Sequence, residues 1–160
     1  MPRALMAFLA GLLMLTPSCS SQEADASPPP VTWEKSELVI ETASGPHRFA
    51  VELALDEKQR ERGLMYRTEM AQDAGMLFFY PTEQEIVMWM KNTVLPLDMV
   101  FIKSDGTVYD NALGAEPYSL DFIRSEGDVR AVLELNAGTV NRIGLKRGDK
   151  VRHALFGNAP

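Results

Sequence analysis

A tryptophan is followed, within a short stretch, by four side chains with strong hydrogen-bonding capacity: Trp89 precedes Lys91, Asn92, Thr93 and Asp98. Polar groups at the end of a strand can hydrogen-bond a small ligand, and an indole ring offers a face for stacking. An equally physical alternative is that Asn92 and Thr93 close a turn whose backbone amides Asp98 satisfies. The pattern therefore predicts either a small-ligand site or a polar turn.

Glu134 is a second candidate, because it lies in the apolar strand sequence Val132–Leu135. A carboxylate there either faces water or is buried beside a partner, since unpaired burial is costly. We prefer the solvent-facing interpretation, in which Glu134 alternates with its apolar neighbours. If Glu134 and Asp98 instead share a pocket, they could act as the acid and base of a hydrolase.

The hypothetical pocket also needs apolar walls and a charged rim. Phe78 and Met90 would supply apolar walls beside Trp89, and Arg67 is a further polar candidate. For Arg67 an ion pair with Asp73, fixing the intervening loop, is a better interpretation than an anion site. The full set of candidate ligand-binding residues is Arg67, Phe78, Trp89, Met90, Lys91, Asn92, Thr93, Asp98 and Glu134.

Metal and cofactor chemistry receive little support from the sequence. The two histidines, His47 and His153, are far apart, and no Cys/His cluster, phosphate-binding loop or nucleophile elbow is present. The methionines suit copper in an exported protein, but most fall at core-facing strand positions, where methionine fills gaps. We therefore expect no metal and no cofactor, and whether the protein is an enzyme stays open.

The strand pattern predicts a mainly β domain. His47–Leu55 alternates apolar and polar residues as a half-buried strand does, and Asp105-Gly106 marks a hairpin. The further expected strands are 37–41, 75–80, 85–90, 97–103, 107–113, 128–135 and 150–156. Many short strands at turn-marked spacing favour a single-domain antiparallel β-sandwich or barrel-like fold with one or two short surface helices.

Two helices are expected on the surface of that domain. Asp56 and Gln59 have the spacing of a capping box, and Gly63 is expected to take the left-handed conformation after the last turn of the helix that they predict. Residues 57–62 are almost wholly polar, so this helix should lie on the outside. Asn136 is expected to cap a second, shorter helix that ends at Gly144.

The first thirty residues have the layout of an export signal and a tether. Arg3 precedes an uncharged apolar run, and small residues around Cys19 follow it, as in a secretory signal of residues 1–19. Cys19, the one cysteine, is a lipidation candidate, with ordinary signal cleavage as the alternative. Residues 20–30 are rich in Ser, Pro and acidic side chains and predict a tether. Residues 31–160 then form the β-rich domain.

Charge and layout together limit the partners. The formal net charge is −6, and no Lys/Arg run is present, so nucleic-acid binding receives no support. Membrane contact is expected only through a lipid on Cys19, and the location is expected to be the periplasm or cell envelope. The partner would be an unidentified small molecule or an envelope protein.

Four motifs in order resemble a known family. They are Arg62–Arg67, Gly75–Phe78, Trp89–Met99 with its Lys-Asn-Thr and Pro-Leu-Asp segments, and Val132–Leu135 with Gly138. This set is similar to the uncharacterised family called domain of unknown function 192, over about Glu37 to Phe156. The resemblance implies a secretory leader followed by one β-rich domain. It implies no activity, substrate or cofactor, because the family has none established.

The leading functional hypothesis is therefore a small-ligand-binding β module of the cell envelope. The first alternative is an envelope hydrolase that uses Asp98 and Glu134. The second is a protein-interaction domain, which requires an exposed apolar patch.

Overall fold

The strands of the domain form one continuous sheet, which a computed structural model describes over residues 31–159. The expected signal, Cys19 and the tether lie outside the described residues. The strands are β1 (Glu34–Thr42), β2 (Gly45–Ala54), β3 (Ala74–Met88), β4 (Leu97–Ile102), β5 (Val108–Ala115), β6 (Ile123–Asn136) and β7 (Lys150–Arg152). The helices are α1 (Glu57–Arg62), α2 (Thr139–Ile143) and the short 3-10 helix η1 (Ala154–Phe156).

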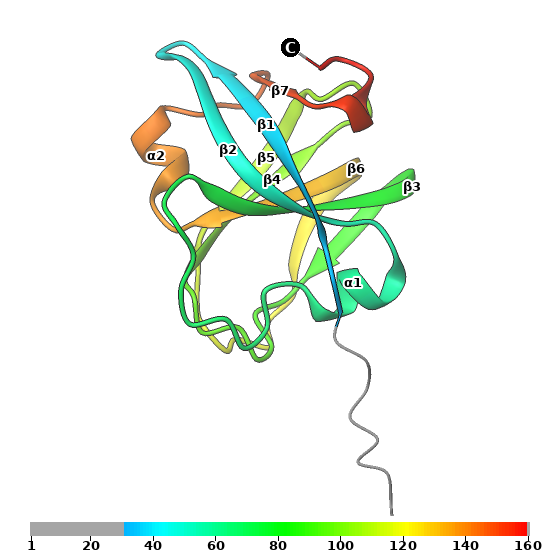
Figure 1. Ribbon diagram of the computed structural model, residues 1–160, viewed down its shortest axis with the longest axis vertical. Helices are drawn as coiled ribbons and strands as arrows, with labels where there is room; N and C mark the ends of the chain where they lie inside the picture. The colour runs from blue at the N-terminus through cyan, green and yellow to red at the C-terminus, as the bar shows by residue number, and fades with distance from the viewer. Residues whose placement is uncertain (1–30, 160) are drawn as a thin grey trace, which may run out of the picture. The chain divides into compact units, whose positions relative to one another are not determined.

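The sheet curls until its two end strands meet. The strand order is β5-β4-β6-β3-β2-β1-β7, and an antiparallel bridge between Thr107 and Lys150 joins the two ends. The Val151 amide also donates to the Gly106 carbonyl at 2.8 Å. Figure 1 shows the curled strands, with α1 and α2 lying apart on different sides. The mainly β, barrel-like fold with short surface helices is therefore confirmed.

One strand pair differs from the expected antiparallel arrangement. β2 and β3 run parallel, with Val51 opposite Gly75 and Leu53 opposite Leu77. A parallel pair needs a crossover connection, and here α1 lies within that connection. The connection therefore leaves the end of β2 and carries α1 alongside the sheet before it returns to β3. The candidate site lies next to α1.

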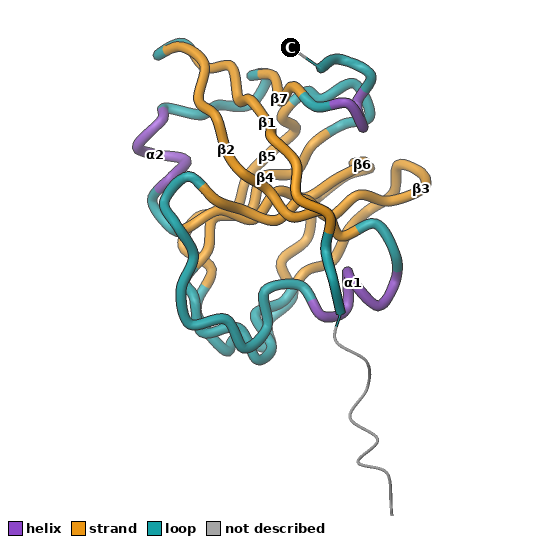
Figure 2. Tube along the Cα trace, viewed as in Figure 1, coloured by secondary structure: helices purple, strands orange, loops and turns teal. Residues whose placement is uncertain are grey.

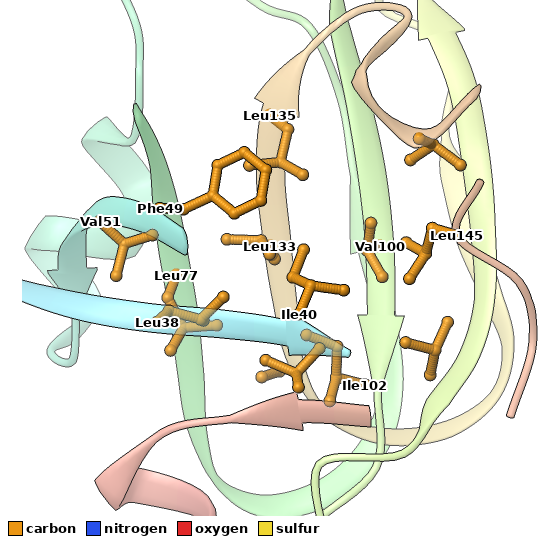
Figure 3. Close-up of a cluster of buried hydrophobic side chains, with 14 of the residues drawn as sticks. Leu38, Ile40, Phe49, Val51, Leu77, Val100, Ile102, Leu133, Leu135 and Leu145 are labelled. Atoms are coloured by element: carbon orange, nitrogen blue, oxygen red, sulfur yellow. The ribbon is translucent and has the colours of Figure 1, made fainter. Parts of the chain in front are cut away.

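The inner face of the curled sheet carries the larger apolar core. Phe49, Val51 and Leu53 on β2 are buried in this core, as the predicted alternation requires. The strand ends at Ala54, and Leu55, the last residue of the predicted apolar face, is exposed. Figure 3 shows side chains from several strands converging in this core, among them Leu38, Ile40, Leu77, Val100 and Leu133. Each large apolar side chain buried in this way stabilises the fold by roughly 1.5–3 kcal/mol.

The outer face of the central strands is buried as well. Along β6, Leu133 and Leu135 belong to the inner core, whereas Val132 belongs to a second apolar cluster on the opposite face. The second cluster contains four of the methionines, Met76, Met88, Met90 and Met99, together with Phe78, Leu97 and Phe101. Core packing is thus confirmed for these methionines. Strands buried on both faces have no solvent side on which a polar residue could alternate.

Several boundaries differ from the sequence prediction. The two expected strands 75–80 and 85–90 form one strand, β3, which continues through Pro81. The pairing of β3 with β6 is interrupted between Phe79 and Gln84, so the missing N–H of Pro81 costs no ladder hydrogen bond. Asn136 ends β6 instead of capping a helix, and its side chain donates to the Met70 and Ala71 carbonyls. The final strand stops at Arg152, and η1 follows it.

Asp98 on β4 is a structural anchor. Its side chain is 1% exposed, and its two oxygens accept hydrogen bonds from the Gly114 amide at 2.9 Å and the Val140 amide at 3.0 Å. The N-cap of α2 is Gly138, which has no side chain, so the Asp98 carboxylate supplies the missing cap from a neighbouring strand. Asp98 therefore ties β5 and α2 to β4.

Replacing Asp98 should cost stability. In the Asp98→Asn variant the amide group would direct an N–H at one of the two backbone donors, which removes one hydrogen bond and leaves that donor unsatisfied. We expect a loss of about 1–3 kcal/mol in the free energy of unfolding, measured by urea denaturation. Asp128→Asn, at an exposed position, is the matched control and should change little. Equal stability of the two variants would contradict the anchoring role.

Candidate functional site

A cleft of about 540 Å³ lies between α1 with its following segment and the C-terminal end of β3. More than half of the candidate ligand-binding residues named from the sequence line this cleft. Its lining residues are Glu57, Arg60, Glu61, Arg62, Gly63, Leu64, Met65, Phe78, Tyr80, Val87, Met88, Trp89, Lys91, Thr93 and Glu134.

Helix α1 forms one wall of the cleft, and its ends are fixed by short-range chemistry. The Asp56 side chain accepts from the Gln59 amide at 2.8 Å, and the Gln59 side chain accepts from the Asp56 amide at 3.1 Å. This is the capping box that the sequence predicts. The helix ends at Gly63, whose φ of +44° and ψ of −137° differ from the expected left-handed conformation.

Gly63 is also required by a close approach to the Phe78 ring. A Cβ built on Gly63 would lie 3.0 Å from the ring carbon Cζ of Phe78, closer than nearly all real Cβ contacts. The absence of a side chain lets the backbone pass directly over the ring at positive φ. The chain then turns back toward the end of β3 and forms the second part of the wall.

Two motifs separated in sequence are joined beside the cleft. The Tyr66 amide donates to the Asn92 carbonyl at 2.8 Å, and both residues have left-handed φ values, 65° and 55°. The Tyr118 amide donates to the Thr93 carbonyl at 3.0 Å, which adds a third loop. Figure 2 shows these loops gathered at one end of the sheet. Asn92 and Thr93 thus form a turn with backbone contacts, as one part of the turn interpretation predicts, but the amides that Asp98 satisfies, those of Gly114 and Val140, lie outside that turn.

Glu134 is the buried acidic group of the cleft. Its side chain is only 4% exposed, and within residues 31–159 no group hydrogen-bonds or pairs with its carboxyl. Burial raises the pKa of this carboxyl to about 8, because removal of water disfavours the charged form. The expectation that Glu134 faces water was wrong, since β6 is buried on both faces.

The mouth of the cleft carries cations. Lys91 is exposed, with its Nζ 4.9 Å from the centre of the Trp89 ring, and Arg62 is exposed, with its Cζ 4.5 Å from the centre of the Tyr66 ring. Neither makes an ion pair with any residue from 31 to 159. The Arg60 guanidinium is instead held by the Leu55 and Phe79 carbonyls, at 2.5 and 3.1 Å.

The pKa of the Tyr80 phenol is affected by burial and by two charged residues of the cleft. Burial raises the pKa of its phenol, the Arg60 cation lowers it, and the Glu134 charge raises it. The phenol therefore remains neutral at physiological pH. Its ring lies 5.0 Å from the Arg60 Cζ.

Five of the nine predicted site residues line the cleft, namely Phe78, Trp89, Lys91, Thr93 and Glu134. Met90 is fully buried in the outer core, and Asn92 holds the loop behind the cleft. Arg67 lines a separate small recess, where it pairs with Glu52 and lies 5.0 Å from the Trp33 ring. The predicted Arg67–Asp73 pair was therefore wrong.

The acid–base pair of the hydrolase hypothesis does not form. Asp98 is opposite Leu135 and Met99 is opposite Glu134 in the β4–β6 ladder, and adjacent residues of a strand point to opposite faces. The two carboxyl groups thus lie on opposite faces of the sheet. Both oxygens of Asp98 are also engaged by backbone amides.

The α1 side of the cleft was missed by sequence reasoning. Arg60 and Arg62 appear in the sequence as part of a polar surface helix, which is where they lie. The signal that would have found them is the crossover between β2 and β3, because it places α1 over the end of β3. That pairing is a long-range property of the fold.

The described chain offers neither a metal cage nor a membrane-spanning helix. No group of three or more His, Cys, Asp or Glu side chains in residues 31–159 is arranged to hold a metal ion. None of the helices of this same region has the length and apolar character needed to cross a bilayer.

The fold and the cleft define a class: a single-domain, curled β-sheet protein with one short crossover helix beside a ligand-sized cleft. The chain belongs to the family named domain of unknown function 192, described as "Uncharacterized ACR", whose family model matches residues 39–153. The predicted family resemblance is confirmed. No curated protein matches the chain.

Two solved structures are similar to this chain. A protein of Sinorhizobium meliloti 1021, described as a "putative transcription regulator", is 50% identical, with a TM-score of 0.77 over 79% of this chain and 98% of its own. A protein of unknown function from Novosphingobium aromaticivorans DSM 12444 is 35% identical, with a TM-score of 0.75 over 88% of this chain and 100% of its own.

The buried Glu134 carboxyl should make stability depend on pH. The carboxyl ionises near pH 4.5 when exposed and near pH 8 in the fold, so between these values the folded state holds a proton that the unfolded state has lost. The wild type should lose stability as pH rises through this window, by about 5 kcal/mol at most. Urea denaturation at several pH values measures this.

Glu134→Gln and Glu134→Met remove the titrating group and should flatten this slope. Met matches the neighbouring Met76 and Met99 and keeps the site filled. Glu116→Gln, at an exposed position, should leave the wild-type slope unchanged. A slope that persists in both Glu134 variants would assign the pH dependence to other groups.

Proposed function

We propose that this protein is a small-ligand-binding module of the cell envelope and that the cleft is its binding site. One observation carries the proposal: the Glu134 carboxyl is buried, has no partner among the described residues, and lines a cleft of about 540 Å³. Buried polar groups are nearly always hydrogen-bonded, so an exception within a cleft calls for an explanation. A ligand that hydrogen-bonds to Glu134 supplies one.

The dimensions and lining of the cleft suit a small molecule. Its volume lies within the roughly 300–1,000 Å³ that is usual for ligand pockets. Apolar side chains, among them Phe78, Met65 and Met88, share the lining with polar and charged groups, and Trp89 is half-exposed. Six of the fifteen lining residues are Glu, Arg or Lys, so the cleft is more polar than a usual ligand pocket and suits a polar or charged ligand.

Binding without catalysis is the simpler interpretation of this site. Glu134 is one ionisable group of unusual pKa, but Asp98 is not available as its acid–base partner. The cleft has no histidine in its lining. His47 lies beside Thr42 and Ser44, and the His153 Nε2 lies 2.9 Å from Ser36 Oγ.

The envelope location comes from the sequence. It depends on the expected signal of residues 1–19, the lipidation candidate Cys19 and the tether of residues 20–30. The description of the Sinorhizobium meliloti relative as a transcription regulator does not lead us to propose DNA binding for this chain, because its net charge is −6.

Exposed apolar side chains favour protein association as a second candidate function. Leu120 and Phe122 are 65% and 62% exposed, and they follow Ser119, whose carbonyl accepts from the Met90 amide at 3.0 Å. Trp89 and Val87, near this hydrogen bond, are about 40% exposed. This is the exposed apolar surface that an interaction domain requires.

A thermal-shift screen tests the ligand proposal. The domain of residues 31–160 would be screened against sugars, peptidoglycan fragments, amino acids, nucleotides and organic acids. A ligand at 100 times its dissociation constant adds about 2.7 kcal/mol, which raises the melting temperature by several degrees. The shift should appear in the wild type and in Glu116→Gln, and should be lost in Glu134→Gln and Glu134→Met.

Two other outcomes would count against the proposal. A shift that is retained in both Glu134 variants would place the ligand elsewhere on the protein. If the wild type is folded and no compound shifts its melting temperature, the ligand proposal fails. Protein association through the surface around Leu120 and Phe122 then becomes the preferred function.

A further inference from the structure

The charges of the cleft are arranged by depth. Glu134 is buried, whereas Lys91 and Arg62 are exposed at the mouth. A ligand that enters the cleft therefore meets an acidic group at the inner end and two cations at the outer end, none of which is ion-paired within residues 31–159. The lining also includes the apolar side chains of Phe78, Met65 and Met88.

The inner end favours a cation over a neutral or anionic group. A carboxyl that is 4% exposed and has no partner among residues 31–159 gains most from a counter-charge that also donates hydrogen bonds. An alkylammonium group supplies both, with three N–H donors. The aromatic rings of Phe78 and Tyr80 in the same lining would add favourable cation–π contacts.

Within residues 31–159 no cationic side chain pairs with the Glu134 carboxyl. Arg60 also lines the cleft, but its guanidinium is held by the Leu55 and Phe79 carbonyls. The Lys91 ammonium lies over the Trp89 ring at the mouth. Lys91 therefore does not pair with the Glu134 carboxyl, which is available to a ligand.

The outer end favours an anion. The Lys91 and Arg62 cations make no ion pair within the described part of the chain, although each lies over an aromatic ring. Glu57 and Glu61 on α1 also line the cleft and are exposed, so the two cations are not the only charges near the outer end. A carboxylate at the ligand's outer end would reach the two exposed cations once the inner end is seated.

We propose that the cleft takes a small zwitterion, with its ammonium group against the Glu134 carboxyl and its acidic group beside Lys91 and Arg62. This inference rests on the proposed function and names the chemical class of its ligand. Amino acids and short amino-carboxylates belong to this class.

Seating of the ammonium group has a consequence for protons. The Glu134 carboxyl loses its proton to solvent when the ammonium group binds, and the ligand keeps its own proton. Binding therefore releases up to one proton at pH values below the pKa of the unliganded carboxyl. A neutral polyol would release none, and an anion would take up protons or leave them unchanged.

A matched set of probes tests this directly. The probes are straight-chain ω-aminocarboxylates of four to six carbons, with the alkylamines, carboxylates and alcohols of the same lengths. Isothermal titration calorimetry in buffers of different ionisation enthalpy measures affinity and the number of protons released. The amines stay protonated throughout, because an alkyl ammonium ordinarily titrates near about 10.4.

The zwitterions should bind most tightly, the amines less tightly, and the carboxylates and alcohols weakly. The dissociation constant of the zwitterions should fall about tenfold per pH unit from pH 6 to about pH 7 and less steeply toward pH 8, with close to one proton released near pH 6. Glu134→Gln and Glu134→Met should abolish binding and proton release. The double variant Lys91→Gln/Arg62→Gln should reduce the zwitterions to the affinity of the amines, and Glu116→Gln should behave as wild type.

The failures are distinguishable. Binding of carboxylates, alcohols or sugars that needs Glu134 but releases no proton would overturn the zwitterion and keep the cleft as a ligand site. Binding of zwitterions without proton release would also overturn it. No binding by any of these probes, together with no hit in the thermal-shift screen, would overturn both the zwitterion and the proposed function.

Discussion

The burial of both faces of the central strands is the constraint on which the site depends. In a sheet with one wet face, a carboxylate that alternates with leucines reaches water and has no special property. Here the inner face of β6 packs into the larger core, and the outer face packs into the methionine-rich cluster. Glu134 lies on that outer face and is therefore removed from water by the fold itself. The desolvation that raises its pKa follows from this placement.

The crossover between β2 and β3 determines that Glu134 lines a cleft instead of a closed core. A parallel strand pair requires a connection that leaves the sheet and returns, and α1 lies in that connection. The helix ends at Gly63, where the backbone passes over the Phe78 ring without a side chain between them. The loop beyond is fixed by the Tyr66–Asn92 hydrogen bond. The cleft therefore opens onto the outer core beside α1.

Local features of the chain were predictable, because they depend on nearby residues. The capping box of Asp56 and Gln59, the alternation through Phe49 and Leu53, and the mainly β class are short-range or additive properties of the sequence. The prominence of Trp89, Lys91 and Glu134 was also visible as unusual polar or aromatic residues within apolar segments. Singling out these three residues needed no knowledge of strand order.

The remaining features depend on pairing between distant segments. Asp98 and Glu134 are on adjacent strands but opposite faces, which follows from a register that no local pattern reveals. The role of Asp98 as the cap of α2 requires contact between β4 and a helix some forty residues later. The parallel pairing of β2 with β3, and with it the α1 wall of the cleft, is equally non-local. Charge alone also could not show that Arg67 pairs with Glu52 instead of Asp73.

The most direct test of this account is a titration of the Glu134 carboxyl itself. The ¹³C chemical shift of its side-chain carbonyl carbon would be followed by NMR in the unliganded domain, with assignment from the Glu134→Gln spectrum. The account predicts a midpoint near the pKa of about 8 that burial confers, well above that of the exposed glutamates. A midpoint near 4.5, the ordinary value, would mean that the carboxyl is hydrated or paired, and it would contradict the buried, unpartnered acid on which the proposed site depends.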